Sequence, residues 1–213
     1  MKKRELYEIC SQRLEQAYPA AATELHFSSP YELLVAVMLS AQCTDKRVNM
    51  VTPALFKAFP TVRDMAIATP EQIFPYVKSV SYPNAKASHL AEMARMVVEK
   101  FGGEIPKDMD SMTSLPGVGR KTANVMLAVA FGDQAMPVDT HVFRVSHRIG
   151  LVPKRCTTPL SVELELVKYF PQDKLSLAHH WLLLHGRYTC TARSPKCQSC
   201  CLSDICSYLK VGI

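Results

Sequence analysis

Lys121 stands at a position that is unusual for a lysine. It follows the turn sequence of residues 115–120 (LPGVGR), in which Pro-Gly-x-Gly permits positive φ and close approach of the backbone. Residues 122–131 are apolar enough for a buried helix closed by Gly132, so Lys121 falls in the first turn of that helix. The positive end of the helix dipole favours the neutral amine there, which is a nucleophile. The residues alone leave a second interpretation open, a solvated lysine that holds a phosphate.

The turn itself predicts a binding site. Residues 108–115 carry apolar side chains at every third position, which predicts a short helix before the turn. A helix, a glycine hairpin and a second helix present amide N–H groups and a helix N-terminus to solvent, and this arrangement binds a phosphate without reading a base. The expected donors are the amides of Gly117, Val118 and Gly119.

Asp139 precedes residues 140–150 (THVFRVSHRIG), which predict a helix. From the residues alone it is an N-cap aspartate, which stabilises a helix by about 1 kcal/mol.

Four cysteines near the C-terminus have the spacing of a metal or cluster site. They are Cys190, Cys197, Cys200 and Cys206, in the pattern C-x6-C-x2-C-x5-C. Structural zinc sites usually draw two ligand pairs from separate knuckles, whereas only one C-x-x-C pair occurs here, so the spacing favours a 4Fe–4S cluster. The other cysteines (Cys10, Cys43, Cys156 and Cys201) are expected to be ordinary small residues, because no export signal points to disulfides.

Basic residues accompany the cysteines. Arg187 precedes them, and Arg193 and Lys196 lie between the first two. A loop pinned at both ends fixes its cations in space, which suits DNA phosphates, although the cations could simply balance the charge of the cluster. The formal charge of +6 fits a polyanionic partner but is modest.

The remaining segments predict helices and no sheet. Ser29 and Pro30 suit the N-cap and first position of an apolar helix, with Glu32 at the capping-box position. That helix ends at Gln42, which either presents its amide to a base edge or is an ordinary polar terminus. Asp45 is expected to cap the next helix.

Further along the chain, residues 81–84 predict a turn before an amphipathic helix over 85–101. His179, His180 and His185 are expected to pack in a core rather than bind metal. No segment approaches the ~20 apolar residues of a membrane span.

Three ordered motifs, LPGVGRKTA, VDTHV and the cysteine spacing, resemble those of the bacterial endonuclease III family in the helix-hairpin-helix superfamily. The similarity covers nearly the whole chain, including SSPYELLVAVMLSAQCTD and HHWLLLHGRYTC. The resemblance implies a base-excision repair enzyme that removes oxidised pyrimidines from damaged double-stranded DNA and cleaves the abasic site by β-elimination. It also implies an all-α fold, with a six-helix barrel over 23–132 and a second domain (1–22 and 133–213) that carries a 4Fe–4S cluster.

Carried over residue by residue, the family's Schiff-base lysine matches Lys121 and its catalytic aspartate matches Asp139. Gln42 matches a residue that fills the gap left by the extruded base. The cluster ligands match the four cysteines, Cys190, Cys197, Cys200 and Cys206. We expect a monomer that binds damaged DNA and no membrane, in the bacterial cytoplasm at the nucleoid.

One segment departs from the family pattern. The family usually shows a glycine, an apolar wedge, a tyrosine and an asparagine before the helix at 85–101, whereas this chain has Ser81-Tyr82-Pro83-Asn84. Tyr82 would then take the wedge position as an aromatic residue, and Pro83 would stiffen the loop.

Two other functions remain open. A monofunctional adenine or mismatch glycosylase needs only a water and Asp139, so Lys121 argues against it. A non-catalytic DNA-binding iron–sulfur protein would bind DNA without nicking abasic sites.

Overall fold

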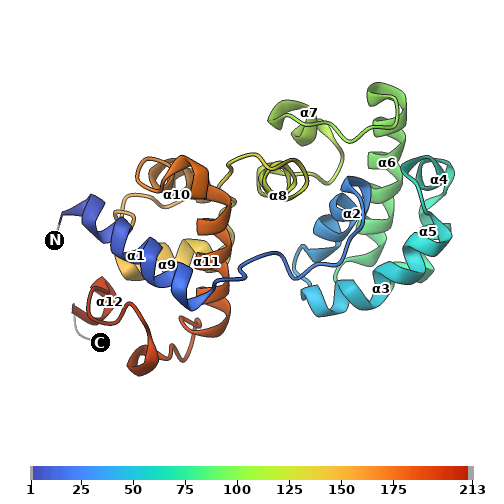
Figure 1. Cartoon of the computed structure of the whole chain (residues 1–213). Coiled ribbons are helices and arrows are strands. Elements are labelled where there is room, and N and C mark those ends of the chain that lie inside the picture. Colours follow the sequence, from blue (N-terminus) through green and yellow to red (C-terminus); the bar gives the residue numbers. More distant parts are fainter. Residues whose placement is uncertain (1, 211–213) are drawn as a thin grey trace. The chain divides into compact units, whose positions relative to one another are not determined.

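The computed structural model describes residues 2–210, and the chain divides into two compact units. One unit is Glu24–Gly132, and the other joins Met1–Thr23 to Asp133–Ile213. This division differs from the expected domain ranges only at residue 23. Between residues 2 and 210 the regular elements are α-helices and short 3-10 segments, and no strand occurs there. The predicted all-α class is therefore confirmed (Figure 1).

Helix α2 (Pro30–Ser40) is the centre of the unit Glu24–Gly132. It is buried from Leu33 to Leu39 and packs against α3 (Asp45–Ala58), α6 (Pro83–Phe101) and α8 (Arg120–Phe131). As predicted, Ser29 is its N-cap and accepts from the Glu32 amide. An apolar surface on all sides suits a helix with neighbours on all sides.

Three further helices complete this unit: α4 (Val62–Ile67), α5 (Pro70–Val77) and α7 (Met109–Ser114). Helix α4, which the sequence analysis did not predict, begins with a capping box formed by Thr61 and Asp64. The expected cap of α3 was wrong: Thr44 is the N-cap, and Asp45 is the first helical residue.

The turn predicted at 81–84 is shorter than expected. Helix α6 begins at Pro83, and Tyr82 is its N-cap with left-handed backbone angles (φ 55°). Proline suits this first helical position because its missing N–H would have no intrahelical partner.

The other unit is built around α11 (Leu175–Tyr188), which packs against α1 (Lys3–Ala17) and α9 (Thr140–Ile149). Its remaining elements are α10 (Pro159–Leu166), α12 (Ser207–Lys210) and the 3-10 segments Gln172–Lys174 and Cys197–Ser199. His179, His180 and His185 are all buried. These histidines therefore pack in the core, as predicted.

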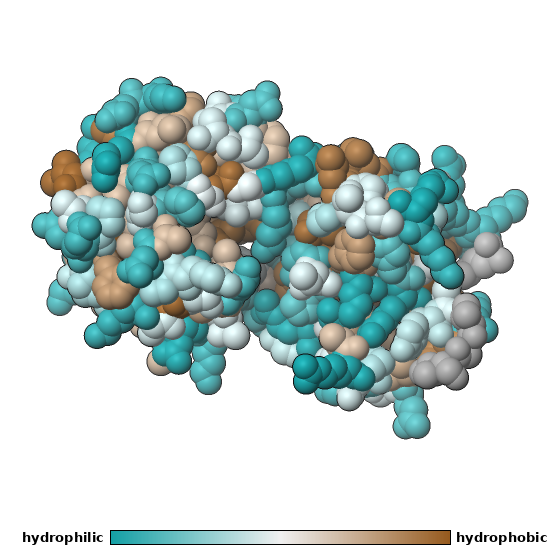
Figure 2. Space-filling model, turned by 180° about the vertical axis from the view of Figure 1, so that it is seen from behind, coloured by the Kyte–Doolittle hydropathy of each residue, from teal (hydrophilic) through white to brown (hydrophobic). Residues whose placement is uncertain are grey.

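The surface carries few large apolar side chains. In Figure 2 they form small separate patches among hydrophilic residues. Among the described residues, no helix is both long and apolar enough to span a membrane.

Candidate catalytic and DNA-binding residues

The glycine hairpin between α7 and α8 lies close against two other helices. Gly117 has a φ of +75°, and a Cβ there would lie 2.9 Å from the His89 Cβ on α6 and 3.0 Å from the Met38 Cε on α2. Only glycine satisfies both the left-handed angles and this close approach. The hairpin is therefore fixed to α2 and α6 by its backbone.

Not all three amides expected to bind phosphate are available. The Val118 amide donates to the Leu115 carbonyl at 3.0 Å, and the Val118 side chain is buried. The expectation for Val118 is thus corrected, since its amide closes the turn. Gly117 and Gly119 are exposed, and Gly119 is the N-cap of α8 with no side chain to satisfy the first amides of that helix.

Lys121 is the second residue of α8, in the first helical turn, where the sequence placed it. Its side chain is exposed, and within residues 2–210 its amine makes no hydrogen bond or ion pair. A lysine amine without a partner is free to reach a reacting atom. Its position beside the hairpin places it next to the predicted phosphate site.

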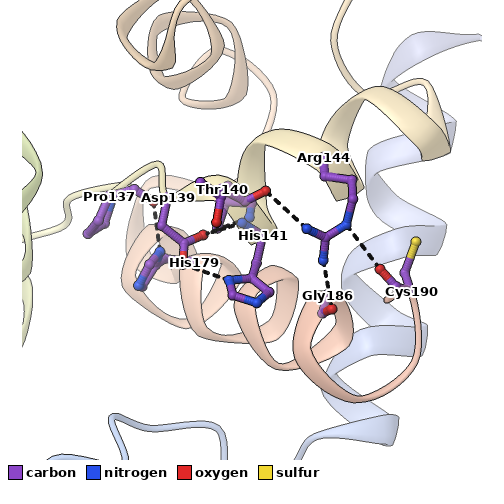
Figure 3. Close-up of polar contacts among 9 residues, drawn as sticks. Pro137, Asp139, Thr140, His141, Arg144, His179, Gly186 and Cys190 are labelled. Atoms are coloured by element: carbon purple, nitrogen blue, oxygen red, sulfur yellow. Dashed lines mark hydrogen bonds and ion pairs between the residues drawn. The ribbon is translucent and has the colours of Figure 1, made fainter. Parts of the chain in front are cut away.

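Asp139 is held far more tightly. It is the N-cap of α9, and its Oδ1 accepts from the amides of His141 at 2.9 Å and Val142 at 2.8 Å. Its Oδ2 lies 3.1 Å from the His141 Nδ1 (Figure 3), and the side chain is only 16% exposed. Burial alone would raise the pKa of Asp139, but the hydrogen bonds from Val142 and His141 outweigh it and hold the pKa below its usual value. Asp139 is therefore a fixed carboxylate that is ionised at neutral pH.

Helix α11 approaches the helix of Asp139 closely. A Cβ on Gly186 would lie 2.8 Å from the His141 Cβ, so glycine is needed there. Figure 3 shows Arg144 of α9 at this junction, where it donates to the carbonyls of Gly186 at 2.8 Å and Cys190 at 3.3 Å. The first residue of the cysteine loop is thus tied to the helix that Asp139 caps.

The four spaced cysteines, Cys190, Cys197, Cys200 and Cys206, line one cavity. Arg148 lies 3.5 Å from the Cys190 Sγ, and the Leu202 amide and the His185 Nε2 lie 3.4 and 3.5 Å from the Cys200 Sγ. Such N–H donors stabilise thiolate ligands. Four thiols spread around one cavity fit a cluster with several iron corners.

The remaining cysteines lie away from the cavity, whereas the basic residues lie in or near the cysteine loop. Cys10 and Cys156 are buried, Cys43 and Cys201 are half-buried, and none of the four lines the cavity. Arg193 and Lys196 are exposed in the cysteine loop, and Arg187 is half-buried. The sequence analysis missed Arg144 and Arg148, although their i, i+4 spacing on one helix was a usable signal.

Gln42 and Tyr82 share a property that the sequence did not reveal. Within residues 2–210 they are the two non-glycine residues with positive φ, at 54° and 55°. Both are exposed, Tyr82 to 65%. They lie in the same unit, at the ends of α2 and α6.

Comparisons with known proteins agree with these features. Residues 35–172 match the model of the HhH-GPD superfamily base excision DNA repair proteins, and residues 190–206 match the iron–sulfur binding domain of endonuclease III. Endonuclease III of Escherichia coli K12 is 44% identical over 98% of this chain and 97% of its own. Endonuclease III of Bacillus subtilis is 43% identical over 93% of this chain and 90% of its own.

Solved structures give the same result. A trapped covalent intermediate of an endonuclease III with DNA superposes with a TM-score of 0.93 at 40% identity, covering 99% of this chain and 98% of that one. A thermostable thymine-DNA glycosylase, at 23% identity, shares the fold, with a TM-score of 0.88 over 97% of this chain and 98% of its own. The chain carries a 4Fe–4S domain, binds DNA and belongs to the endonuclease III family of base-excision DNA repair enzymes.

Proposed function

We propose that this chain, a DNA glycosylase and abasic-site lyase, uses Lys121 as its nucleophile on oxidised pyrimidines in damaged double-stranded DNA. The observation that carries the proposal is the exposed amine of Lys121, which has no partner within residues 2–210 and follows the glycine hairpin directly. The amides of Gly117 and Gly119 and of the first turn of α8 hold a phosphate beside the lesion.

The chemistry follows from the amine. The damaged base is first taken out of the stack. The lone pair of Lys121 attacks C1′ of the sugar, and the glycosidic bond breaks so that its electron pair leaves with the base. The nitrogen then loses a proton and its lone pair expels O4′ from C1′, so that the sugar ring opens, O4′ takes up a proton, and a protonated Schiff base forms at C1′. Loss of a proton from C2′ drives cleavage of the 3′ C–O bond, which is the lyase step.

Asp139 serves this reaction as an anion. Its carboxylate stabilises the positive charge that develops on the sugar, or takes a proton from the lysine amine. Both roles need an ionised group that stays in place, and the hydrogen bonds from Val142 and His141 favour that state.

Four thiolates, of Cys190, Cys197, Cys200 and Cys206, would hold the 4Fe–4S cluster in the cavity that they line. The cluster, when bound, supplies a fixed point for the loop and so orients Arg187, Arg193 and Lys196 toward DNA phosphates. Gln42 and Tyr82 contact the DNA at the extruded base. We further propose that the protein acts as a monomer on the nucleoid DNA of the bacterial cytoplasm.

The test is reductive trapping on a duplex with one abasic site. Lys121→Gln should abolish the covalent adduct formed in borohydride, while leaving DNA binding largely intact. Lys100→Gln, which changes another exposed lysine of the same unit, should trap normally. Undiminished trapping by Lys121→Gln would reject Lys121 as the nucleophile.

A further inference from the structure

Two exposed residues of the unit Glu24–Gly132 have an unfavourable backbone conformation. Left-handed angles are unfavourable for a non-glycine residue, and both Gln42 and Tyr82 adopt them. Such strain persists only where the surrounding structure over-determines it, and it gathers at functional sites. We therefore expect contacts with neighbouring residues to hold Gln42 and Tyr82 in this conformation.

Ser81 links the two loops directly. Its Oγ donates to the Gln42 carbonyl at 2.5 Å, across 39 positions of sequence. This bond joins the loop that follows α2 to the residue that precedes Tyr82. The family pattern usually has glycine at this position, which has no hydroxyl to make such a bond.

Lys86 holds the same junction from below the surface. Lys86 is only 8% exposed, and its ammonium donates to the carbonyls of Leu39 at 2.8 Å and Ala41 at 2.7 Å. These carbonyls belong to the last turn of α2, where intrahelical donors have run out. Burial lowers the pKa of Lys86, which shows that the group is kept inside against a desolvation penalty. A lysine of α6 thus takes the place of a helix C-cap on α2.

The phosphate-binding hairpin rests on the same two helices. Gly117 lies against Met38 and His89, which are three residues from Ala41 on α2 and from Lys86 on α6. Three residues is about one helical turn. The offset between the hairpin and the loops of Gln42 and Tyr82 therefore depends on how α2 and α6 are held together.

We propose that Ser81 and Lys86 are positioning residues, which hold Gln42 and Tyr82 in one fixed arrangement for entry into the DNA stack. This inference rests on the proposed contact of Gln42 and Tyr82 with DNA. We call the Ser81 bond to Gln42 and the two Lys86 bonds the loop tie. Ordering loops and side chains during binding costs binding free energy, and so does extruding a base from the stack. Because the loop tie orders the loops before DNA binds, less of the binding free energy is needed to order them and more is available to extrude the base.

The decisive substrate pair is the same oxidised pyrimidine in a fully paired duplex and in single-stranded DNA. Ser81→Ala should slow single-turnover base release from the duplex about three- to tenfold, the range for one lost hydrogen bond. Release from the single strand, where no stack must open, should change less than twofold. Lys86→Met keeps an apolar stem of similar length, loses two bonds, and should show a larger duplex defect.

A matched control removes a serine hydroxyl from α6 that takes no part in the loop tie. Ser88→Ala, whose hydroxyl donates to Glu92, should leave both rates unchanged. Adding Ser81→Ala to Gln42→Ala should not slow base release from the duplex any further. The effects of two residues are not additive when one acts through the other. Lys86→Arg, which retains donors, should recover part of the duplex rate.

Equal losses on both substrates, or no loss from Ser81→Ala, would overturn the proposal. If Gln42→Ala and Tyr82→Ala slow duplex processing but Ser81→Ala does not, the loop tie alone is refuted. If Gln42→Ala and Tyr82→Ala leave the duplex rate unchanged, the proposed DNA contact fails and the positioning role fails with it. Borohydride trapping tests the nucleophile Lys121 separately. It therefore distinguishes the failure of the loop tie or of the DNA contact from the failure of the proposed nucleophile.

Discussion

The two units hold their proposed catalytic groups in opposite ways. Lys121 of Glu24–Gly132 is exposed and has no partner within residues 2–210, whereas Asp139 of the other unit is 16% exposed and accepts from two amides and the His141 ring. A nucleophile must move as its bond forms, so a free side chain suits it. A carboxylate that stabilises charge acts best when it is already in place.

The units also differ in what fixes their loops. In Glu24–Gly132 the hairpin beside Lys121 is fixed by its backbone, through the close approach of Gly117 to α2 and α6, and only the loops of Gln42 and Tyr82 are joined by side chains, those of Ser81 and Lys86. In the other unit side chains join segments that are distant in sequence, as Arg144 does to Cys190 and Arg13 does to Asp204. Mutations should therefore act differently in the two units.

The largest effect should come from neutralising the fixed carboxylate. Asp139→Asn should lower turnover at least ~100-fold, because the charge disappears from a site organised around it. Asparagine is as good an N-cap as aspartate, so the melting temperature should change little. Normal turnover with a lowered melting temperature would reduce Asp139 to a helix cap and remove the contrast with Lys121.

Loss of a cluster ligand should affect one unit and spare the other. Cys197→Ala should abolish the absorbance near ~400 nm that thiolate-ligated iron gives. Hydrogen exchange should rise in residues 190–206 and DNA affinity should fall, while α2 and α6 keep their protection. Cys201→Ala, four positions along and outside the cavity, should keep its colour. Faster hydrogen exchange throughout Glu24–Gly132 would show that both units depend on the cluster for their stability.

Two glycines of the hairpin should differ in stability. Gly117→Ala forces a side chain into left-handed angles and against His89, which should destabilise the fold by about 1–3 kcal/mol. A Cβ on Gly119 meets nothing within 4 Å, so Gly119→Ala should lose at most ~1 kcal/mol as a poorer N-cap. Chemical denaturation measures both. Equal losses would mean that close backbone approach does not fix the hairpin.

The smallest effect concerns pH. The pKa of Asp139 is lowered in the folded chain, so its ionised form adds stability at pH values above the unfolded pKa of about 3.9. This contribution is lost as pH falls through the lower folded pKa. The stability difference between the wild-type chain and Asp139→Asn should therefore shrink as pH falls from 5 to 2. A difference that is constant over this range would show that Asp139 gains nothing from its hydrogen bonds as an anion.

The sequence predicted what local rules determine. The caps at Ser29 and Asp139, the glycine that ends α8, and the first-turn position of Lys121 all follow from residues within a few positions of each other. The ordered motifs led to the correct family. The roles of Lys121, Asp139 and the four cysteines remain predictions.

The features that the sequence missed depend on contacts between distant segments. Lys86 reads as one residue of an amphipathic helix, and nothing local shows that its amine reaches the end of α2. The left-handed angles of Gln42 and Tyr82 have no signal in the sequence either, because neither residue is a glycine. Val118 was wrongly expected to offer its amide because the turn bond to Leu115 was not foreseen.

The most direct test of the account is the site of the covalent adduct. A reaction on abasic DNA should be reduced with borohydride, digested and analysed by mass spectrometry. We expect the sugar remnant on the peptide that contains Lys121, joined through Nζ. An adduct on any other side chain, or none, would contradict the proposed chemistry.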